Sequence, residues 1–535
     1  MGKRRIEATA ALPADDVADH RKAVQMRKTS NTLDRRAERR MRRRDFLATS
    51  LAIAATGCTV SKGPDAAEAA GSAAQGEWIP LFNSTDLDGW RASENVASWQ
   101  VREGTLSADG PRSHLFYVGN AVPTPFRNFD FMVDVITEKN ANSGIFFHTE
   151  FVETGSPPKG YEVQINNSYP MTGNNPEFRR TGGLFAIRDI YKAWLPDDVW
   201  FRVRVCVIGK RIRVWVNGIP TTDYVEPEDP PRARNRTLRR VSEGTVALQA
   251  HDPGSRMRFR NPRIRLLPDD ADPFAELRAS EDGYGLKPGL IDQMAALGLP
   301  ITDFHVHIRG GMTVEKAVLR QAVTGVNCGV LENVGRGWPI DDNEKLRSFL
   351  DAAAGQPVFV GVQVNDRDWA EVLAPDLIAQ LDYVLADTMI MPMPHDDSPP
   401  VKLWITDNYT IDDPDAWMER YVRHNLRVLA EPISILANPT WLPPTVASQY
   451  DRLWTDERMR KIVSAAVDRG VALEINASSG YPPLKFLQLA KEMGAKFSLG
   501  TNNFDDKPID MSRCFEMIET LGLRFADMFL PRPKA

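Results

Sequence analysis

The sequence predicts two domains of different fold class, an antiparallel β-sandwich followed by a parallel β/α barrel, behind a separate N-terminal segment. At 535 residues the chain exceeds the usual domain size of about 150 residues, which favours two or three units. Many short strand patterns without helices fill residues 77–267, as is typical of a sandwich. Strand and helix patterns then alternate seven or eight times over residues 289–535, as is typical of a barrel of the TIM type.

The composition is that of an ordinary globular protein, with 42% hydrophobic and 26% charged residues. A net charge of −5 and a pI near 6.0 predict no nucleic-acid partner, because nucleic-acid-binding domains are usually basic. The cysteines lie far apart and form no CxxC pair, which predicts neither a disulfide framework nor a zinc knuckle. They are Cys58, Cys206, Cys328 and Cys514.

Residues 1–76 have the pattern of a targeting segment rather than of a folded domain. Arg43 and Arg44 begin the twin-arginine export pattern R-R-x-F-L, and the apolar run that follows is shorter than the roughly 20 residues of a transmembrane helix. Gly57-Cys58 resembles a lipobox, in which the cysteine is acylated, and an Ala/Gly/Ser-rich tether follows. We therefore expect export by the twin-arginine route to the periplasm or cell envelope, with membrane contact only through a lipid on Cys58.

Alternating apolar residues mark the strands of the predicted sandwich. In "FDFMVDVITE" every second residue from Phe129 to Val135 is apolar, which indicates a half-buried strand. "WFRVRVCVIGKRIRVWVNG" shows the same alternation on both sides of Gly209-Lys210, which predicts a hairpin. Because no helical pattern separates these strands, we expect antiparallel pairing throughout this region.

Six stretches of the region resemble, in order and spacing, the 3-keto-disaccharide hydrolase family. They are "IPLFNSTDLDGW", "NSGIFFH", "GYEVQINN", "TGGLF", "DDVWFRVRV" and "VWVNG", and the likeness covers residues 77–267. The resemblance implies a concanavalin-like jelly roll that cleaves a glycosidic bond in 3-keto-glycosides. A ketone at C3 acidifies H2 of the sugar, so a general base and an electrophile on the ketone suffice to eliminate the C1 substituent. We expect a carbohydrate substrate and activity in this segment by itself.

Five residues are the candidates for this chemistry. Glu162 and Gln164 in "YEVQI" share one face of the predicted strand, because side chains alternate with period two, and they fit a polar row on the concave side of a sheet. Asn142, with His148 and Arg188, could complete a polyol-binding or metal-assisted site, although the family often has an arginine where His148 stands. Without the resemblance, Glu162 could equally be a solvent-facing strand carboxylate.

Residues 268–288 are polar and contain Pro and Gly, which predicts a linker, and a barrel follows from residue 289. Its polar clusters resemble the polymerase-and-histidinol-phosphatase (PHP) family of metal-dependent hydrolases across residues 300–530. "ITDFHVHI" supplies the H-x-H motif of that family as His305 and His307, and later landmarks are "LDYVLAD", "ILANP", "LEIN" and "SLGTNN". Amide or apolar side chains replace most of the later metal ligands of the family, among them Asn333 and Gln363.

Because amides are weak ligands, the pattern predicts one zinc- or manganese-like divalent ion rather than a cluster of three. His305 and His307 would hold it. The further ligand candidates are Glu332, His395 and Glu474, with Asp303 as a hydrogen-bond partner behind them. The alternative is a decayed barrel, in which the two histidines are hydrogen-bonded remnants and amides line the mouth to bind a sugar or a partner.

Taken together, these patterns predict an exported carbohydrate-active hydrolase or lyase with a second, PHP-like barrel. Two alternatives stay open. One is a non-catalytic surface lipoprotein that only binds glycans. The other is a metal-dependent phosphoesterase in the barrel, with the sandwich as a sugar-targeting module.

Overall fold

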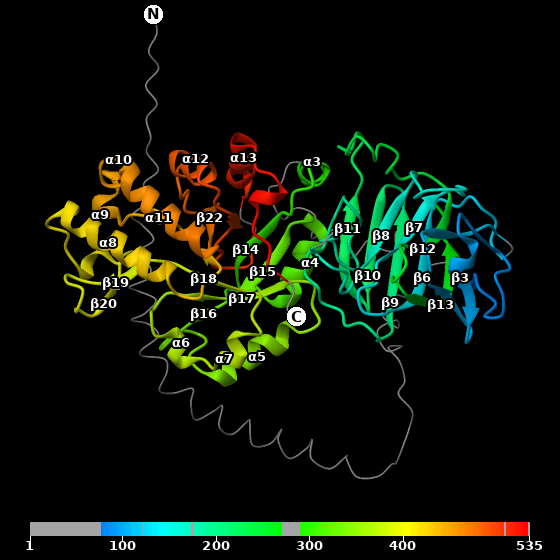
Figure 1. The fold of residues 1–535 in the computed structure, drawn as a ribbon, viewed down its shortest axis with the longest axis horizontal. Helices are drawn as coiled ribbons and strands as arrows, with labels where there is room; N and C mark the ends of the chain where they lie inside the picture. The colour runs from blue at the N-terminus through cyan, green and yellow to red at the C-terminus, as the bar shows by residue number, and fades with distance from the viewer. Residues whose placement is uncertain (1–75, 120, 173–175, 270–288, 508–509, 533–535) are drawn as a thin grey trace, which may run out of the picture. The chain divides into compact units, whose positions relative to one another are not determined.

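The computed structural model describes residues 76–119, 121–172, 176–269, 289–507 and 510–532 (Figure 1). The predicted signal segment, Cys58 and residues 270–288 of the predicted linker lie outside these ranges. The described residues all belong to one compact unit. In this part of the chain, no helix has the length and apolar character needed to cross a membrane.

Two antiparallel sheets pack face to face to form the sandwich (Figure 1). The larger, sheet A, has eight strands in the order β11-β10-β9-β6-β13-β4-β3, with β1 on β13. Its strands are β1 (Ile79–Pro80), β3 (Trp99–Arg102), β4 (Thr105–Ala108), β6 (Phe129–Thr137), β9 (Phe201–Ile208), β10 (Arg211–Val216), β11 (Ile219–Val225) and β13 (Met257–Leu266). The predicted hairpin is β9 and β10, which pair with Ile208 opposite Arg211.

The smaller sheet, sheet B, has five strands in the order β2-β5-β12-β7-β8. They are β2 (Trp90–Ala92), β5 (Ser113–Tyr117), β7 (Ser143–Thr149), β8 (Tyr161–Ile165) and β12 (Thr245–Ala250). Every second residue of the strands enters one hydrophobic core between the sheets, for example Phe131 and Val133 of β6 and Ile145 of β7. The alternation in the sequence therefore marks burial between two sheets, and the antiparallel sandwich is confirmed.

The C-terminal half is a closed parallel barrel surrounded by helices (Figure 1). Its strands run in the order β15-β14-β23-β22-β21-β18-β17-β16, and pairing of β15 with β17 closes the ring. They are β14 (Thr302–His307), β15 (Asn327–Leu331), β16 (Asn333–Val334), β17 (Phe359–Val364), β18 (Tyr383–Ala386), β21 (Ile435–Leu436), β22 (Ala472–Asn476) and β23 (Phe497–Gly500). Because β16 continues β15 after one residue, the described barrel has seven strands, and the predicted barrel class is confirmed.

The main helices between the barrel strands are amphipathic and bury their apolar residues in one shared core. They are α3 (Leu290–Ala296), α4 (Val314–Thr324), α5 (Asn343–Ala353), α8 (Pro414–Leu429), α11 (Asp456–Arg469), α12 (Leu484–Glu492) and α13 (Ser512–Leu521). Short helices are α6 (Trp369–Val372), α7 (Pro375–Ile378), α9 (Pro444–Ala447) and α10 (Tyr450–Leu453), and a hairpin of β19 (Ile390–Pro392) and β20 (Pro400–Lys402) follows β18. Side chains at the carboxyl ends of the parallel strands meet at one end of the barrel, here called the barrel mouth.

Candidate functional site

The outer face of sheet B carries two rows of side chains that point away from the sandwich core. Core residues such as Ile145 and Val163 alternate with them along each strand. The strand register forms a polar row of His114, Gln249, Gly144 and Gln164. It also forms a second row of Phe116, Ala247, Phe146 and Glu162, which is apolar except for its last member. The two rows therefore end together at β8, where the predicted base lies.

Glu162 is buried at the end of the second row, against Gly144 of the neighbouring strand. Only 7% of its surface is exposed, and a Cβ atom on Gly144 would stand 2.5 Å from Glu162 Oε1. Arg239 Nη2 donates a hydrogen bond to Glu162 Oε2 over 3.2 Å. Burial raises the pKa of Glu162, against the opposing positive charge of Arg239. The site thus holds a carboxylate of raised basicity in a fixed position.

A series of hydrogen bonds leads from Gln164 on the edge strand β8 to the residues that follow β12. Gln164 Nε2 donates to Asn142 Oδ1 over 2.7 Å, and Asn142 Nδ2 lies 3.2 Å from His251 Nε2. His251 Nδ1 in turn lies 2.5 Å from Asp252 Oδ2. The Asp252 carboxylate can only accept, so His251 donates to it through Nδ1 and accepts through Nε2. This series of bonds therefore fixes the orientation of the Asn142 and Gln164 side-chain amides.

Four buried polar atoms on or beside the outer face of sheet B have no hydrogen-bond partner among the described residues. They are Gln164 Oε1, Gln249 Oε1, His114 Nδ1 and Arg239 Nη1. Buried polar groups are nearly always paired, so a group of them on one face is a place where a polar ligand would supply the missing bonds. Two amide oxygens that accept and one guanidinium N–H that donates match the hydroxyl and carbonyl groups of an oxidised sugar.

A depression with a volume of about 450 Å³ lies at the opposite end of the apolar row, next to Phe116. Phe151 and Lys159 also line it. It lies on the same face of sheet B as Glu162, so a ligand longer than one sugar could extend along the row toward it.

Of the other two sandwich candidates, His148 belongs to the packing of the sandwich. A backbone φ of 51° breaks the strand alternation there, so the side chain does not join the outer row. Its Nε2 donates to the backbone oxygen of Arg127 over 2.7 Å, and its Nδ1 accepts from the backbone N–H of Ser242 over 3.3 Å. Burial lowers its pKa to about 4, so the ring is neutral at physiological pH. The prediction that His148 belongs to the same site as Glu162 is therefore wrong, because its side chain lies inside the sandwich.

Arg188 also lies apart from Glu162, in the loop between β8 and β9. Its Nη2 donates to Asp292 Oδ2 over 3.0 Å, and its guanidinium stacks over the ring of Tyr224. Both contacts hold it away from the outer face of sheet B. The structure therefore brings Glu162, Gln164 and Asn142 together and leaves the other two candidates outside.

Sequence reasoning missed the residues that complete the group. Gln249 on β12 and His251, one residue after its end, lie two apart in "ALQAHD", so the alternation that places Glu162 and Gln164 on one face could have found them. Arg239 gives no such signal, because it is one of five arginines in "RARNRTLRR" and lies in an irregular loop. Only the folded chain shows which arginine reaches the carboxylate.

At the barrel mouth, the first predicted histidine ligand forms a buried ion pair. His305 Nδ1 lies 2.6 Å from Glu474 Oε1, and His305 Nε2 lies 3.3 Å from Gln363 Oε1. Burial opposes the charged imidazole, but the Glu474 carboxylate raises the pKa of His305. The predicted partner Asp303 is bonded to Thr501 and to the backbone of His305. Both ring nitrogens of His305 therefore face oxygen acceptors and donate to them, so neither offers a lone pair to a metal.

The second predicted histidine contacts a guanidinium. Arg309 Nη2 lies 2.6 Å from His307 Nδ1 and also donates to Glu332 Oε1 and Asn333 Oδ1. Burial lowers the pKa of His307 to about 4. His395 lies elsewhere, exposed between β19 and β20, where its backbone N–H donates to Ser398 Oγ. Among the described residues no group of three or more His, Cys, Asp and Glu side chains could hold a metal ion, so the predicted ion does not fit this donor set.

Comparison with known proteins gives a family match for the sandwich. Residues 77–265 fit the model of a family described as a 3-keto-alpha-glucoside-1,2-lyase-like domain. A search of curated proteins gave no match.

Among solved structures, two of a putative glycosyl hydrolase from Parabacteroides distasonis are similar, at 20% and 23% identity and TM-scores of 0.30 and 0.28. Both cover 36% of this chain, and 94% and 100% of their own. The carbohydrate-binding module CBM66 from Bacillus subtilis is similar at 10% identity and a TM-score of 0.23, over 33% of this chain and 95% of its own. The resemblance of the barrel to the PHP family stays a prediction. The 77–265 segment, by contrast, matches a family of carbohydrate-active domains, as its motifs predict.

Proposed function

We propose that the sandwich cleaves 3-keto-glycosides by elimination across C1 and C2, with Glu162 as the base. The observation that carries the proposal is the buried, basic carboxylate of Glu162 surrounded by unpartnered polar atoms on the outer face of sheet B. The family match of residues 77–265 supports the same chemistry. A carboxylate whose pKa is raised toward the working pH is a better general base than an exposed one.

In the proposed step, Glu162 takes the H2 proton, and the C–H electron pair forms an enolate with the C3 ketone. The enolate then expels the C1 substituent: a C1=C2 double bond forms, the C1–O bond breaks, and the leaving oxygen takes a proton. Addition of water across this double bond gives the free 3-keto sugar, so the net outcome is hydrolysis. Arg239 Nη1, which has no partner among the described residues, is the donor available to the ketone oxygen.

The amide oxygens of Gln164 and Gln249 would accept hydrogen bonds from the remaining sugar hydroxyls. The NH₂ group of Gln164 donates to Asn142. This bond leaves the amide oxygen of Gln164 facing the ligand. This orientation favours a polyol, which donates several hydrogen bonds, over an anion, which only accepts them.

The test is turnover of a 3-keto-glucoside in D₂O, followed by NMR. We expect release of the C1 alcohol from the 3-keto compound, and either a 1,2-unsaturated 3-ketone or a free 3-keto sugar that carries deuterium at C2. The matched glucoside with a C3 hydroxyl should not react, because its H2 is not acidic. Equal cleavage of that control without deuterium at C2 would contradict the elimination. Tight binding without any turnover would favour the glycan-binding alternative.

We further propose that the protein acts in the cell envelope, after twin-arginine export and lipidation at Cys58. The support is the sequence pattern of residues 43–58. Replacing Arg43 and Arg44 by lysine should leave the precursor in the cytoplasm, because the pathway distinguishes the arginine pair from mere charge. Cys58→Ser should release the protein from the membrane fraction. Cell fractionation with immunoblotting checks both, and an unchanged distribution of either variant would refute the corresponding step.

A further inference from the structure

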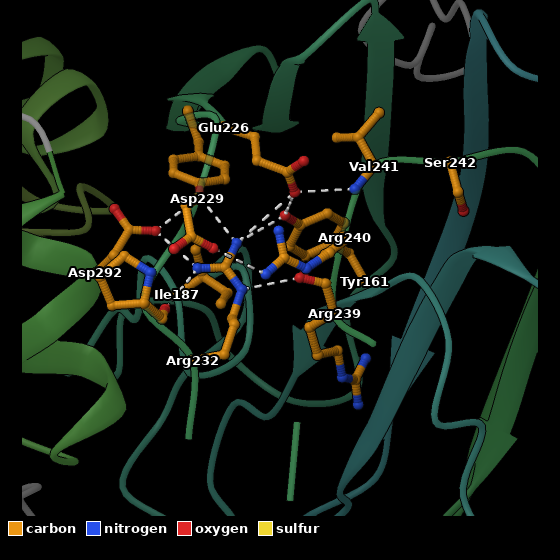
Figure 2. Close-up of polar contacts among 12 residues, drawn as sticks. Tyr161, Ile187, Glu226, Asp229, Arg232, Arg239, Arg240, Val241, Ser242 and Asp292 are labelled. Atoms are coloured by element: carbon orange, nitrogen blue, oxygen red, sulfur yellow. Dashed lines mark hydrogen bonds and ion pairs between the residues drawn. The ribbon is translucent and has the colours of Figure 1, made fainter. Parts of the chain in front are cut away.

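The loop between β11 and β12 is fixed by one buried arginine. Figure 2 shows Arg232 at the centre of a polar network on the side of the sandwich that faces α3. Its guanidinium has five N–H donors, and each has an acceptor. The acceptors are Arg239 O, Pro231 O, Asp292 Oδ1, Tyr161 OH and Tyr224 OH, all within 2.9 Å. Arg232 is therefore completely satisfied, and its side chain is only 3% exposed.

Two carboxylates pair with Arg232: Glu226 of the sandwich, at 3.7 Å, and Asp292 of the barrel half of the chain, which accepts a hydrogen bond at 2.8 Å. Asp292 lies in α3, and its residue is 1% exposed. Its Oδ1 also accepts from Tyr224 OH over 2.6 Å, and its Oδ2 accepts from Arg188 over 3.0 Å. Asp292 thus bonds two buried guanidinium groups of the sandwich at once.

This network is linked by two contacts to the candidate base. Arg232 Nε donates to the backbone oxygen of Arg239 over 2.8 Å, and the Arg239 side chain bonds Glu162. Between β11 and β12 the loop contains no strand or helix. Besides turn bonds within the loop and one backbone bond from Gly160 N–H to Leu238 O over 3.2 Å, side-chain bonds hold it. A second bond, from Val241 N–H to Glu226 over 2.9 Å, fixes its far end. The position of Arg239 therefore depends on Arg232.

We propose that Asp292 is a positioning residue for the Glu162 site, acting through Arg232 on the loop that carries Arg239. The inference rests on the proposed function for its catalytic consequence. Without the Asp292 carboxylate, Arg188 would lose its ion pair and Arg232 would keep the longer ion pair with Glu226, an unfavourable arrangement for two buried guanidinium groups. The loop would relax to solvate them and would draw Arg239 away from Glu162. The barrel half of the chain would then be needed for full activity of the sandwich, contrary to the expectation from the sequence that residues 77–267 are active by themselves.

The test is Asp292→Asn in the full chain, with two readouts. Hydrogen exchange of the backbone over residues 232–242 needs no substrate, and we expect it to accelerate. The kcat on a 3-keto-glucoside should fall by about 10-fold, within the range that coupling through packed networks produces. Lys192→Met is the matched control, because it breaks another ion pair between the two halves, Lys192 with Asp382 at 2.5 Å, without touching the loop. It should change neither readout.

A double-mutant cycle with Arg239→Met separates positioning from general damage. If Asp292 acts through Arg239, then Asp292→Asn should cost less than about twofold in kcat in the Arg239→Met background. Full additivity, or unchanged exchange of residues 232–242, would overturn the proposal. Should Asp292→Asn not fold, Tyr224→Phe removes one bond of the network and must show the same exchange pattern. A wild-type chain inactive on 3-keto-glucosides would refute the proposed function and leave the exchange test valid.

Discussion

Glu162→Gln is expected to lower kcat on a 3-keto-glucoside by about 10²- to 10⁴-fold, the usual contribution of a positioned general base. Glutamine keeps the shape of the side chain and can still bond Arg239, but it has no basic oxygen. Binding of substrate should therefore persist, and the KM should change little. Steady-state kinetics across pH provide the measurement.

The pH dependence of the wild-type enzyme is part of the same expectation. Only the carboxylate form of Glu162 can accept H2, so kcat should fall as the pH drops through the pKa of Glu162. Because burial raises that pKa, the acidic limb should lie above the ordinary glutamate range near 4.3. The residual activity of Glu162→Gln should lack this limb.

Glu228→Gln serves as the control for this experiment, because Glu228 is an exposed carboxylate whose side chain is 95% accessible. It should leave both kcat and the pH profile unchanged. Full turnover by Glu162→Gln would place the base elsewhere in the chain. If His305→Ala/His307→Ala then proved inactive on the same substrate, the barrel would be the catalyst and the sandwich its sugar-binding attachment.

The strand pattern predicted the sandwich because period two is a local property of the chain. It also placed Glu162 and Gln164 on one face of a strand, which is the outer face of β8, but the family resemblance was needed to select them as site candidates. The same rule failed at His148, where a φ of 51° reverses the expected face. It could not find Arg239 or Asp292, because their roles depend on long-range contacts with Glu162 and Arg232.

In the barrel, too, the sequence could not predict contacts between residues that lie far apart in the chain. The H-x-H spacing correctly placed His305 and His307 side by side, with ring centroids 5.2 Å apart. Glu474 and Glu332, which were predicted as further metal ligands, lie against the two histidines. What the sequence did not reveal is that Arg309, two residues beyond the motif, turns back between His307 and Glu332. A basic residue in a loop carries no local sign of where its side chain ends.

Arg309→Ala is expected to open a metal site at His307 and Glu332, where the wild-type chain has the guanidinium of Arg309. In the wild-type chain the guanidinium meets His307 Nδ1, Glu332 Oε1 and Asn333 Oδ1, so a fixed positive charge stands where a divalent ion would contact the same three atoms. Arginine stays protonated at every accessible pH, so metal and guanidinium exclude each other. Removing the side chain frees an imidazole, a carboxylate and an amide oxygen, which are ligands suited to zinc or manganese. Isothermal titration with Zn²⁺ or Mn²⁺ should show about one ion per chain in Arg309→Ala.

Two further variants make this result specific to the barrel mouth. Arg309→Ala/His307→Ala should lose the ion again, because the strongest of the three ligands is gone. Arg309→Lys should remain metal-free, since it keeps a cation on the same stem. Elemental analysis of the wild-type protein after dialysis is the decisive comparison: an ion that is retained there, and lost in His305→Ala/His307→Ala, would restore the metal site predicted from the H-x-H motif. The fixed charge of Arg309 would then have to move aside on metal binding, and titration of Arg309→Ala should show only a modest gain in affinity rather than a new site.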